Sequence, residues 1–168
     1  CISSAASDVY KRQVRSYLDI QKMRYGDRLD YQIRIPEELK KLYTVKLLIQ
    51  PLAENSIYHG IKESDRKGTI LITAGEEPGG FYLCVRDDGL GISQETLTIL
   101  NADLKRGVTV SDGGYGIFNV NERIRLYFGR DYGLELRSCA GKWTEAVIHL
   151  PKYIPERTEW DVSDFDRR

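Results

Sequence analysis

Four stretches of the chain repeat apolar residues at helical spacing, and they predict amphipathic helices over 8–25, 45–57, 93–101 and 117–128. Gly26 and Gly129 follow the first and the last of them, where glycine commonly ends a helix. Pro51 interrupts the second, so a kink or a fresh helix start is expected there, with Gly60 as its closure. Ser93 is suited to cap the third helix.

Five shorter segments have the apolar or alternating pattern of β-strands, at 31–35, 69–74, 81–86, 134–138 and 144–150. Pro-Gly-Gly at 78–80 predicts a turn between the second and third strands, and Gly141 predicts one between the last two. Residues 103–115 are rich in glycine and are predicted to form a loop. The order of the elements predicts an α+β fold with a mixed, mainly antiparallel sheet, rather than an alternating βαβ fold.

The composition argues against several classes of protein but does not identify a function. A chain of 168 residues that is 41% hydrophobic and 30% charged suits one folded domain with a solvated surface. Lys plus Arg and Asp plus Glu number 25 each, so charge does not favour nucleic acid as a partner. The three cysteines are far apart in sequence and predict neither a disulfide framework nor a zinc site, which fits a reducing compartment. No apolar run reaches the roughly 18 residues that cross a bilayer, and no GxxxxGK(S/T) phosphate loop occurs.

The first candidate for chemistry is Asn55, a polar residue in the middle of an otherwise apolar helical stretch. His59 and Lys62 lie one and two turns further along the same side. An amide oxygen at this place would suit a hard cation such as Mg²⁺, with His59 or Lys62 close to phosphate. Taken alone, a solvent-exposed helix position is the more common explanation for such an asparagine.

Two glycine-rich segments are the next candidates. The sequence DDGLG at 87–91 ends the third predicted strand, where a carboxylate can accept a hydrogen bond from an exocyclic amine and glycines let the backbone approach a flat ring. The sequence GGYG at 113–116 opens the last helix, whose N-terminal amides and dipole favour phosphate. On its own, each segment is explained about equally well as an ordinary Asp-Gly turn or a flexible helix entry.

In order and spacing, these three segments resemble the N, G1 and G2 boxes of the GHKL ATPases, which include gyrase, Hsp90, MutL and histidine kinases. Thr144, on a late strand, resembles the threonine of the family's G3 element. The sequences YLDIQKMRYGDRL (17–29), QPLAENSIYHGI (50–61) and GIFNVNERIRLYFG (116–129) narrow the resemblance to sensor histidine kinases of the LytS/YesM type. The resemblance runs from about residue 9 to residue 151.

The resemblance implies a Bergerat-type two-layer α/β sandwich with helices on one face of the sheet, binding ATP with Mg²⁺. Asn55 would ligate Mg²⁺, and Asp87 would accept the adenine amino group, partly through water shared with Thr144. Residues 101–115 would form a lid, from which Lys105 and Arg106 either reach the γ-phosphate or stay as a solvated pair. The expected ATP-binding residues are Asn55, His59, Lys62, Asp87, Gly89, Gly91, Ile92, Lys105, Arg106, Gly114, Tyr115, Gly116, Ile117 and Thr144. No catalytic residue is assigned.

Two departures from the family pattern bear on the reaction. Gyrase-like members carry a glutamate base one turn before the metal-binding asparagine, where this chain has Pro51. Glu54 is adjacent to Asn55 in sequence, but neighbouring helix residues point about 100° apart, so Glu54 cannot simply substitute for that base. The phosphoacceptor histidine that LytS/YesM-type kinases carry upstream is absent, and neither His59 nor His149 has a suitable context. The expected function is therefore transfer of the ATP γ-phosphate to a histidine outside these residues. A GHKL-type ATPase switch, a non-catalytic nucleotide-binding module and an anti-sigma-type serine kinase are the alternatives.

The resemblance also implies an organisation of the chain and a set of partners. The expected parts are a tail at 1–7, a helical junction from a dimerisation domain at 8–29, the ATP-binding domain at 30–151 and a charged tail at 152–168. Expected partners are an upstream histidine-containing dimerisation domain, a second copy of the full-length protein and a response regulator, without nucleic acid. This part alone is not expected to autophosphorylate. It is expected to be cytoplasmic, in a parent protein anchored in the plasma membrane.

Overall fold

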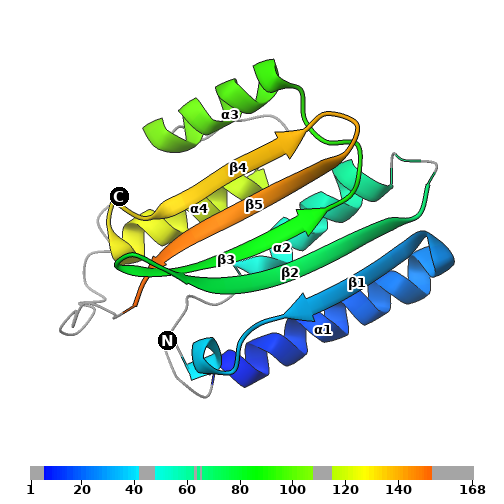
Figure 1. Ribbon diagram of the computed structural model, residues 1–168, viewed down its shortest axis with the longest axis horizontal. Helices are drawn as coiled ribbons and strands as arrows, with labels where there is room; N and C mark the ends of the chain where they lie inside the picture. Colours follow the sequence, from blue (N-terminus) through cyan, green and yellow to red (C-terminus); the bar gives the residue numbers. More distant parts are fainter. Residues whose placement is uncertain (1–5, 42–47, 63, 65, 108–114, 153–168) are drawn as a thin grey trace, which may run out of the picture.

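One five-stranded sheet organises the computed structural model, which describes residues 6–41, 48–62, 64, 66–107 and 115–152. Its strand order is β1-β2-β3-β5-β4 (Figure 1). The strands are β1 (Leu29–Arg34), β2 (Gly68–Glu77), β3 (Gly80–Asp87), β4 (Gly133–Cys139) and β5 (Trp143–Pro151). β1 pairs with β2 in parallel and every other neighbouring pair is antiparallel, so the predicted mixed, mainly antiparallel sheet is confirmed.

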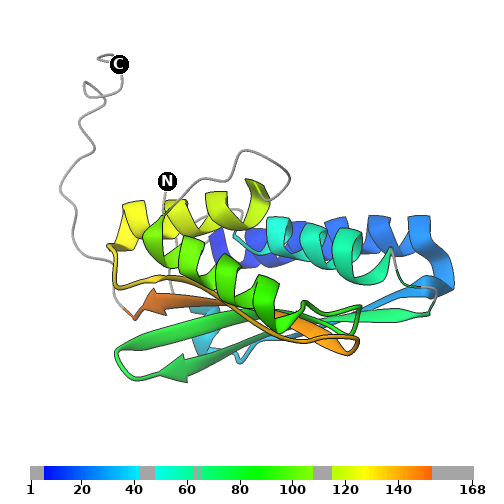
Figure 2. The same cartoon turned by 90° about the horizontal axis from the view of Figure 1, so that it is seen from above.

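The helices lie on one side of this sheet, as the sequence predicts. Figure 2 shows α1 (Ala6–Tyr25), α2 (Ile49–Asn55) and α4 (Tyr115–Phe128) side by side in one layer. The helix α3 (Gln94–Arg106) lies beside the outer strand β4 (Figure 1). Short 3₁₀ turns η1 (Gly26–Arg28) and η2 (Glu38–Lys41) flank β1, and a π-helical segment η3 (Ser56–Ile61) continues α2. None of the helices in the described part of the chain is long and apolar enough to span a bilayer.

The core fills the space between the helices and the sheet. Leu18, Leu52 and Ile124 from the helices meet Ile70 and Ile148 from the sheet, and each of these side chains is at most 1% exposed. Burying an aliphatic side chain of this size contributes about 1.5–3 kcal/mol relative to leaving it in water. The strands alternate, so their other residues form a more polar opposite face.

Two local predictions are wrong. The loop predicted from residue 103 is still helix up to Arg106, because Leu97 and Leu104 continue the helical period and are buried against β4. Gly107, with φ of 73°, ends that helix in the left-handed conformation. Gly60 does not close the second helix, which passes through it as a π-helix with a bond from the Lys62 N–H to the Ile57 carbonyl.

Other predictions fall at the limits of the described residues. Pro51 lies in the first turn of α2, so the helix starts there as expected. The expected tail at 1–7 lies outside the described residues apart from Ala6 and Ser7, which are helical. The charged tail lies outside them from residue 153 onward.

Candidate functional site

A cavity of about 310 Å³ opens between the sheet and the helices α2, α3 and α4. Seven residues that the sequence predicts for the site line it: Asn55, His59, Asp87, Gly91, Ile92, Ile117 and Thr144. They come from segments that are far apart in the chain and that the fold brings together. The remaining wall is mostly apolar, and an apolar cavity of this size with a few polar groups is typical of small-molecule sites.

Asp87 is the buried charged group of this cavity. It ends β3 and is only 2% exposed. Its carboxylate accepts hydrogen bonds from the Gly89 N–H, at 3.1 Å, and from the Ser56 hydroxyl. Burial raises the pKa of Asp87, and these two hydrogen bonds offset part of that rise. Thr144 stands directly opposite Asp87 in the β3–β5 pairing, so both side chains are available to one edge of a ligand.

Gly60 and Gly89 allow the backbone to close around this carboxylate. A Cβ at Gly60 would lie 2.5 Å from Oδ1 of Asp87, and a Cβ at Gly89 would lie 2.3 Å from the Gly60 carbonyl oxygen. A residue with a side chain would displace the Asp87 carboxylate at position 60 and the Gly60 backbone at position 89. The π-helical segment η3 therefore packs directly on the end of β3, and such segments occur often at functional sites.

The loop after β3 is joined to the turn between β4 and β5. Gly91 has φ of 65°, and a Cβ there would lie 2.2 Å from the Cys139 carbonyl oxygen. The Ile92 N–H donates to Oγ of Ser138 at 2.8 Å, and that hydroxyl lies 3.3 Å from the Thr144 hydroxyl. These contacts hold the Gly91–Ile92 backbone at the wall of the cavity.

Arg66, which precedes β2, adds a second connection between the same two segments. Its Nη2 donates to the carbonyl oxygens of Asp88 at 3.1 Å, Gly89 at 2.9 Å and Gly141 at 3.0 Å. One guanidinium group thus bridges the loop after β3 and the β4–β5 turn. The sequence gives no local signal for this role, because Arg66 lies outside every motif.

Asn55 lies where α2 ends, close to the first turn of α4. A Cβ at Gly116 would be 3.2 Å from Nδ2 of Asn55 and 3.5 Å from its Oδ1, so glycine permits the close approach. Nδ2 is buried and has no hydrogen-bond partner within the described part of the chain. A buried amide without a partner is uncommon in a folded protein and points to a group that binds something else.

His59 and Lys62 follow Asn55 but occupy different surroundings. His59 lines the cavity and its ring lies edge-on to Tyr58, with the ring centres 5.0 Å apart. Lys62 does not line the cavity, and its ammonium lies 4.3 Å from the centre of the Tyr58 ring.

The predicted lid residues either line a different hollow from the cavity or lie outside the described residues. Lys105 and Arg106 end α3 and line a separate hollow of about 300 Å³ beside α4. Arg106 is 72% exposed and lies 3.8 Å from Asp103. Gly114 lies outside the described residues, and only the helical backbone is described for Tyr115.

Several residues line the cavity but are not among the ATP-binding residues expected from the sequence: Leu52, Ser56, Gly60, Thr96, Leu100, Leu136 and Ala146. Leu52, Ser56 and Gly60 are four residues apart from one another, and Leu52 lies three residues before Asn55, so helical spacing in this segment was a usable signal. The others carry no local signal, because an apolar residue that lines a cavity looks like any core residue.

Comparison with known proteins gives a consistent family. The family model for "Histidine kinase-, DNA gyrase B-, and HSP90-like ATPase" matches residues 43–154. Sensor histidine kinase YesM of Bacillus subtilis (strain 168) is 36% identical over 138 residues, which are 82% of this chain. Sensor histidine kinase YpdA of Escherichia coli (strain K12) is 33% identical over 139 residues, which are 83% of this chain. The chain spans 22% and 23% of the lengths of these two relatives.

Solved structures agree on the fold. The Acinetobacter baumannii histidine kinase AdeS superposes with a TM-score of 0.61 at 15% identity, covering 86% of this chain and 64% of that one. The histidine kinase domain of the Erythrobacter litoralis EL346 blue-light activated histidine kinase superposes with a TM-score of 0.55 at 16% identity, covering 83% of this chain and 63% of that one. At these identities the likeness concerns the fold alone.

Proposed function

Because this chain belongs to the family of histidine kinase-, DNA gyrase B- and HSP90-like ATPases, we propose that it binds ATP with Mg²⁺ and donates the γ-phosphate to a histidine. The observation that carries the proposal is the buried Asp87 carboxylate in a mostly apolar cavity that Asn55 also lines. The relatives YesM and YpdA, which match most of this chain, are named sensor histidine kinases, which supports a kinase within the family.

The adenine would bind at Asp87. A carboxylate fixed by Gly89 and Ser56 is an oriented acceptor for an exocyclic amine, and Thr144 offers a hydroxyl beside it. The Gly91–Ile92 backbone would lie against the ring. Apolar contacts would come from the side chains that share the cavity wall.

The phosphates and the metal ion would bind near Asn55 and the start of α4. The described residues contain no cluster of three or more His, Cys, Asp or Glu side chains that could hold a metal ion, so Asn55 would be the main protein ligand. This fits Mg²⁺, which usually keeps several waters and is held largely by phosphate oxygens. Once bound, the ion neutralises charge on the phosphates. Gly116, in the first turn of α4, would direct its backbone N–H group toward phosphate, and the same role is proposed for Gly114, which lies outside the described residues.

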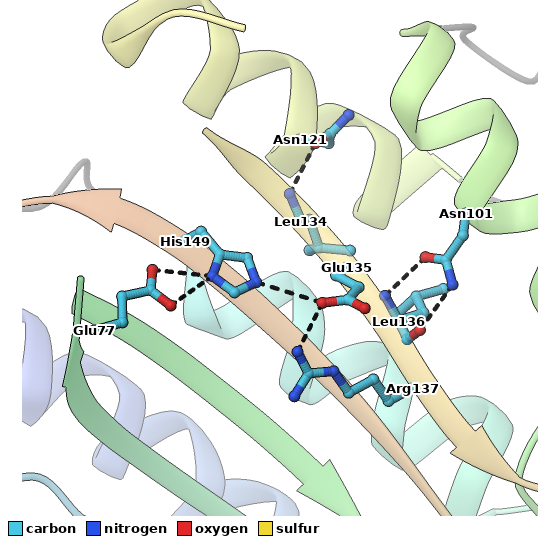
Figure 3. Close-up of polar contacts among 8 residues, drawn as sticks. All are labelled: Glu77, Asn101, Asn121, Leu134, Glu135, Leu136, Arg137 and His149. Carbon is cyan, nitrogen blue, oxygen red and sulfur yellow. Dashed lines mark hydrogen bonds and ion pairs between the residues drawn. The ribbon is translucent and has the colours of Figure 1, made fainter. Parts of the chain in front are cut away.

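The acceptor histidine would lie outside this chain. His149 sits on the sheet face opposite the cavity and contacts Glu77 at 2.9 Å and Glu135 at 3.5 Å (Figure 3). It is therefore engaged by carboxylates and remote from the cavity. His59 lines the cavity and is more suitably placed to contact the nucleotide than to receive its phosphate. We propose an upstream helical dimerisation domain as the source of the acceptor, with residues 8–29 as its junction and residues 30–151 as the ATP-binding domain.

The same proposal extends to the oligomeric state, partner and location of the full-length protein. The full-length protein would be a homodimer that passes its phosphate to a response regulator. It would be anchored in the plasma membrane with this domain in the cytoplasm. The relatives' names and the family pattern support this arrangement.

An ATP-hydrolysing switch is the second candidate, and the surroundings of Asn55 do not favour it. Pro51 stands where a glutamate base would be needed. Glu54 is exposed, accepts a hydrogen bond from Gln50 at 3.0 Å and does not line the cavity.

The test is a phosphoryl-transfer assay with labelled MgATP. This chain is mixed with a separately expressed upstream helical segment that contains its histidine, and each component is also tested alone. We expect acid-labile label on the histidine only in the mixture. Label that appears with Asp87→Asn as strongly as with the wild type would contradict the proposed site, and Asp131→Asn, in an exposed turn, is the matched control. Steady phosphate release by this chain alone would instead support the hydrolytic switch.

A further inference from the structure

The outer edge of β4 is closed by side-chain amides rather than by another strand. β4 pairs only with β5, so the backbone groups of Leu134 and Leu136 that point outward have no strand partner in the described sheet. Asn101 of α3 accepts from the Leu136 N–H at 2.9 Å and donates to the Leu136 carbonyl oxygen at 2.8 Å (Figure 3). Both polar atoms of the Asn101 side chain therefore bind the backbone of Leu136.

Asn121 of α4 makes a second connection of the same kind. It is 3% exposed, accepts from the Leu134 N–H at 2.9 Å and donates to the Leu104 carbonyl oxygen at 2.9 Å. Figure 3 shows both asparagines along the edge of β4. Gly133 makes room for this contact, because a Cβ there would lie 2.7 Å from Oδ1 of Asn121. The end of α3, the middle of α4 and the edge of β4 are thus tied together.

Arg125 strengthens the same junction from the next turn of α4. Its Nη1 donates to the carbonyl oxygens of Leu104 and Lys105, both at 3.0 Å. These carbonyls belong to the last turn of α3, where helices leave acceptors without internal partners. The C-terminal end of α3 is therefore satisfied by α4.

The elements joined in this way are also walls of the cavity. Leu100 and Thr96 of α3, Leu136 of β4 and Ile117 of α4 all line it. Leu136 takes part in both arrangements, because its backbone binds Asn101 while its side chain faces the cavity. In the described fold, α3 packs on the sheet mainly through β4, so its distance from the sheet is set at that strand.

We propose that Asn101 and Asn121 are positioning residues for the nucleotide: they set the distance of α3 from β4 and thereby the width of the cavity. The inference rests on the proposed function, since it assigns these residues an effect on nucleotide binding. Neither side chain lines the cavity, so neither needs to contact the ligand.

The test compares MgATP affinity in the 168-residue chain by calorimetry, at a temperature where every variant is folded. Asn101→Leu keeps the side-chain size and removes both hydrogen bonds, and we expect its Kd to rise about tenfold. Asn121→Asp keeps the acceptor for Leu134 but loses the donor to Leu104, and its Kd should rise about threefold.

The control separates positioning from general stability. Val14→Ala removes core volume in α1, away from the cavity, and should lower the melting temperature without changing the Kd. An Asn101→Leu protein that is less stable but binds MgATP within about twofold of the wild type would overturn the inference alone. A wild type that does not bind MgATP would instead overturn the proposed function, and this inference with it.

A second measurement needs no variant. Hydrogen exchange of the Leu134 and Leu136 amides in the wild type reports how firmly the two asparagines hold the edge of β4. We expect saturating MgATP to slow exchange at both amides by about fivefold or more, because ligand in the cavity opposes the opening of α3. Unchanged exchange at these amides, with slowed exchange at Gly91 and Ile92, would contradict the coupling.

Discussion

Replacing Asp87 with asparagine should weaken nucleotide binding and stabilise the folded chain at the same time. The substitution keeps the shape of the side chain and removes its charge. Asp87 is 2% exposed, and within the described part of the chain its partners are the Gly89 N–H and the Ser56 hydroxyl, both of which donate to it. The two opposite effects follow from this single environment.

The substitution lowers the affinity because it removes a carboxylate oxygen that would accept a hydrogen bond from the ligand. The Gly89 N–H donates to Oδ1 of Asp87 at 3.1 Å. In the variant, the side-chain amide oxygen is therefore expected to keep this position, and the NH₂ group to occupy the position of Oδ2. An amine of the ligand would then meet a donor instead of an acceptor. A hydrogen bond to a charged group contributes about 1.5–3 kcal/mol, which corresponds to a rise in Kd of roughly 10- to 100-fold.

The gain in stability comes from the desolvated charge. Burial raises the pKa of Asp87 above its ordinary value of 3.8, so the native state holds the proton more tightly than the unfolded chain does. The free energy of unfolding therefore falls as pH rises from that ordinary value through the raised native pKa. Asp87→Asn removes this dependence, and the variant should be more stable than the wild type at neutral pH.

Two assays check both effects on the same samples. Urea unfolding at several pH values above 3.8, expressed as the difference between the variant and the wild type, gives the change in unfolding free energy and its dependence on pH. Calorimetric titration with MgATP gives the Kd. A variant that is both less stable and unchanged in binding would refute the assignment of Asp87 as a buried, ligand-facing carboxylate.

Three further substitutions or modifications test the surroundings of the cavity. Gly60→Ala would place a Cβ 2.5 Å from Oδ1 of Asp87. We therefore expect a loss of about 1–3 kcal/mol in the free energy of unfolding, together with weaker nucleotide binding. Normal nucleotide binding in this variant would contradict the close contact. Arg66→Ala removes the donor to three carbonyl oxygens and should speed amide exchange in the loop after β3, whereas Lys67→Ala, next to it and 59% exposed, should not. Burial raises the pKa of Cys84 to about 11, so roughly one thiol in a thousand is ionised at pH 8, and iodoacetamide should alkylate Cys84 far more slowly in the folded chain than in urea.

Two of the predicted site residues that the structure places in the cavity have a local chemical signature in the sequence. Asp87 follows a strand and precedes two glycines, and Asn55 is a polar residue in an apolar stretch. Such residues stand out because their type conflicts with the pattern around them. The structure brings both to one cavity, together with Thr144 from a strand near the end of the chain.

The parts that the sequence could not predict depend on distant contacts. Asn101 appears at the end of a predicted short helix, and nothing near it in sequence indicates that it binds Leu136 of β4. Glycines at 107, 113 and 114 predict a loop, but tertiary packing of Leu104 extends the helix to Arg106. Lys105 and Arg106 are then held at the end of that helix, beside a hollow other than the cavity.

In the proposed function, the carboxylates described around the cavity suit phosphoryl transfer better than hydrolysis by a carboxylate base. Among the described residues that line it, only Asp87 and His59 carry such groups. Asp87 is already bound by Ser56 and Gly89, and Glu54 lies outside the cavity with Gln50 as its partner. This part of the wall can therefore hold and orient a nucleotide, but it offers no carboxylate beside Asn55 to take a proton from water. An incoming imidazole would bring its own nucleophilic nitrogen, so the proposed transfer requires only alignment, to which the residues of this wall can contribute, and charge neutralisation, which bound Mg²⁺ would supply.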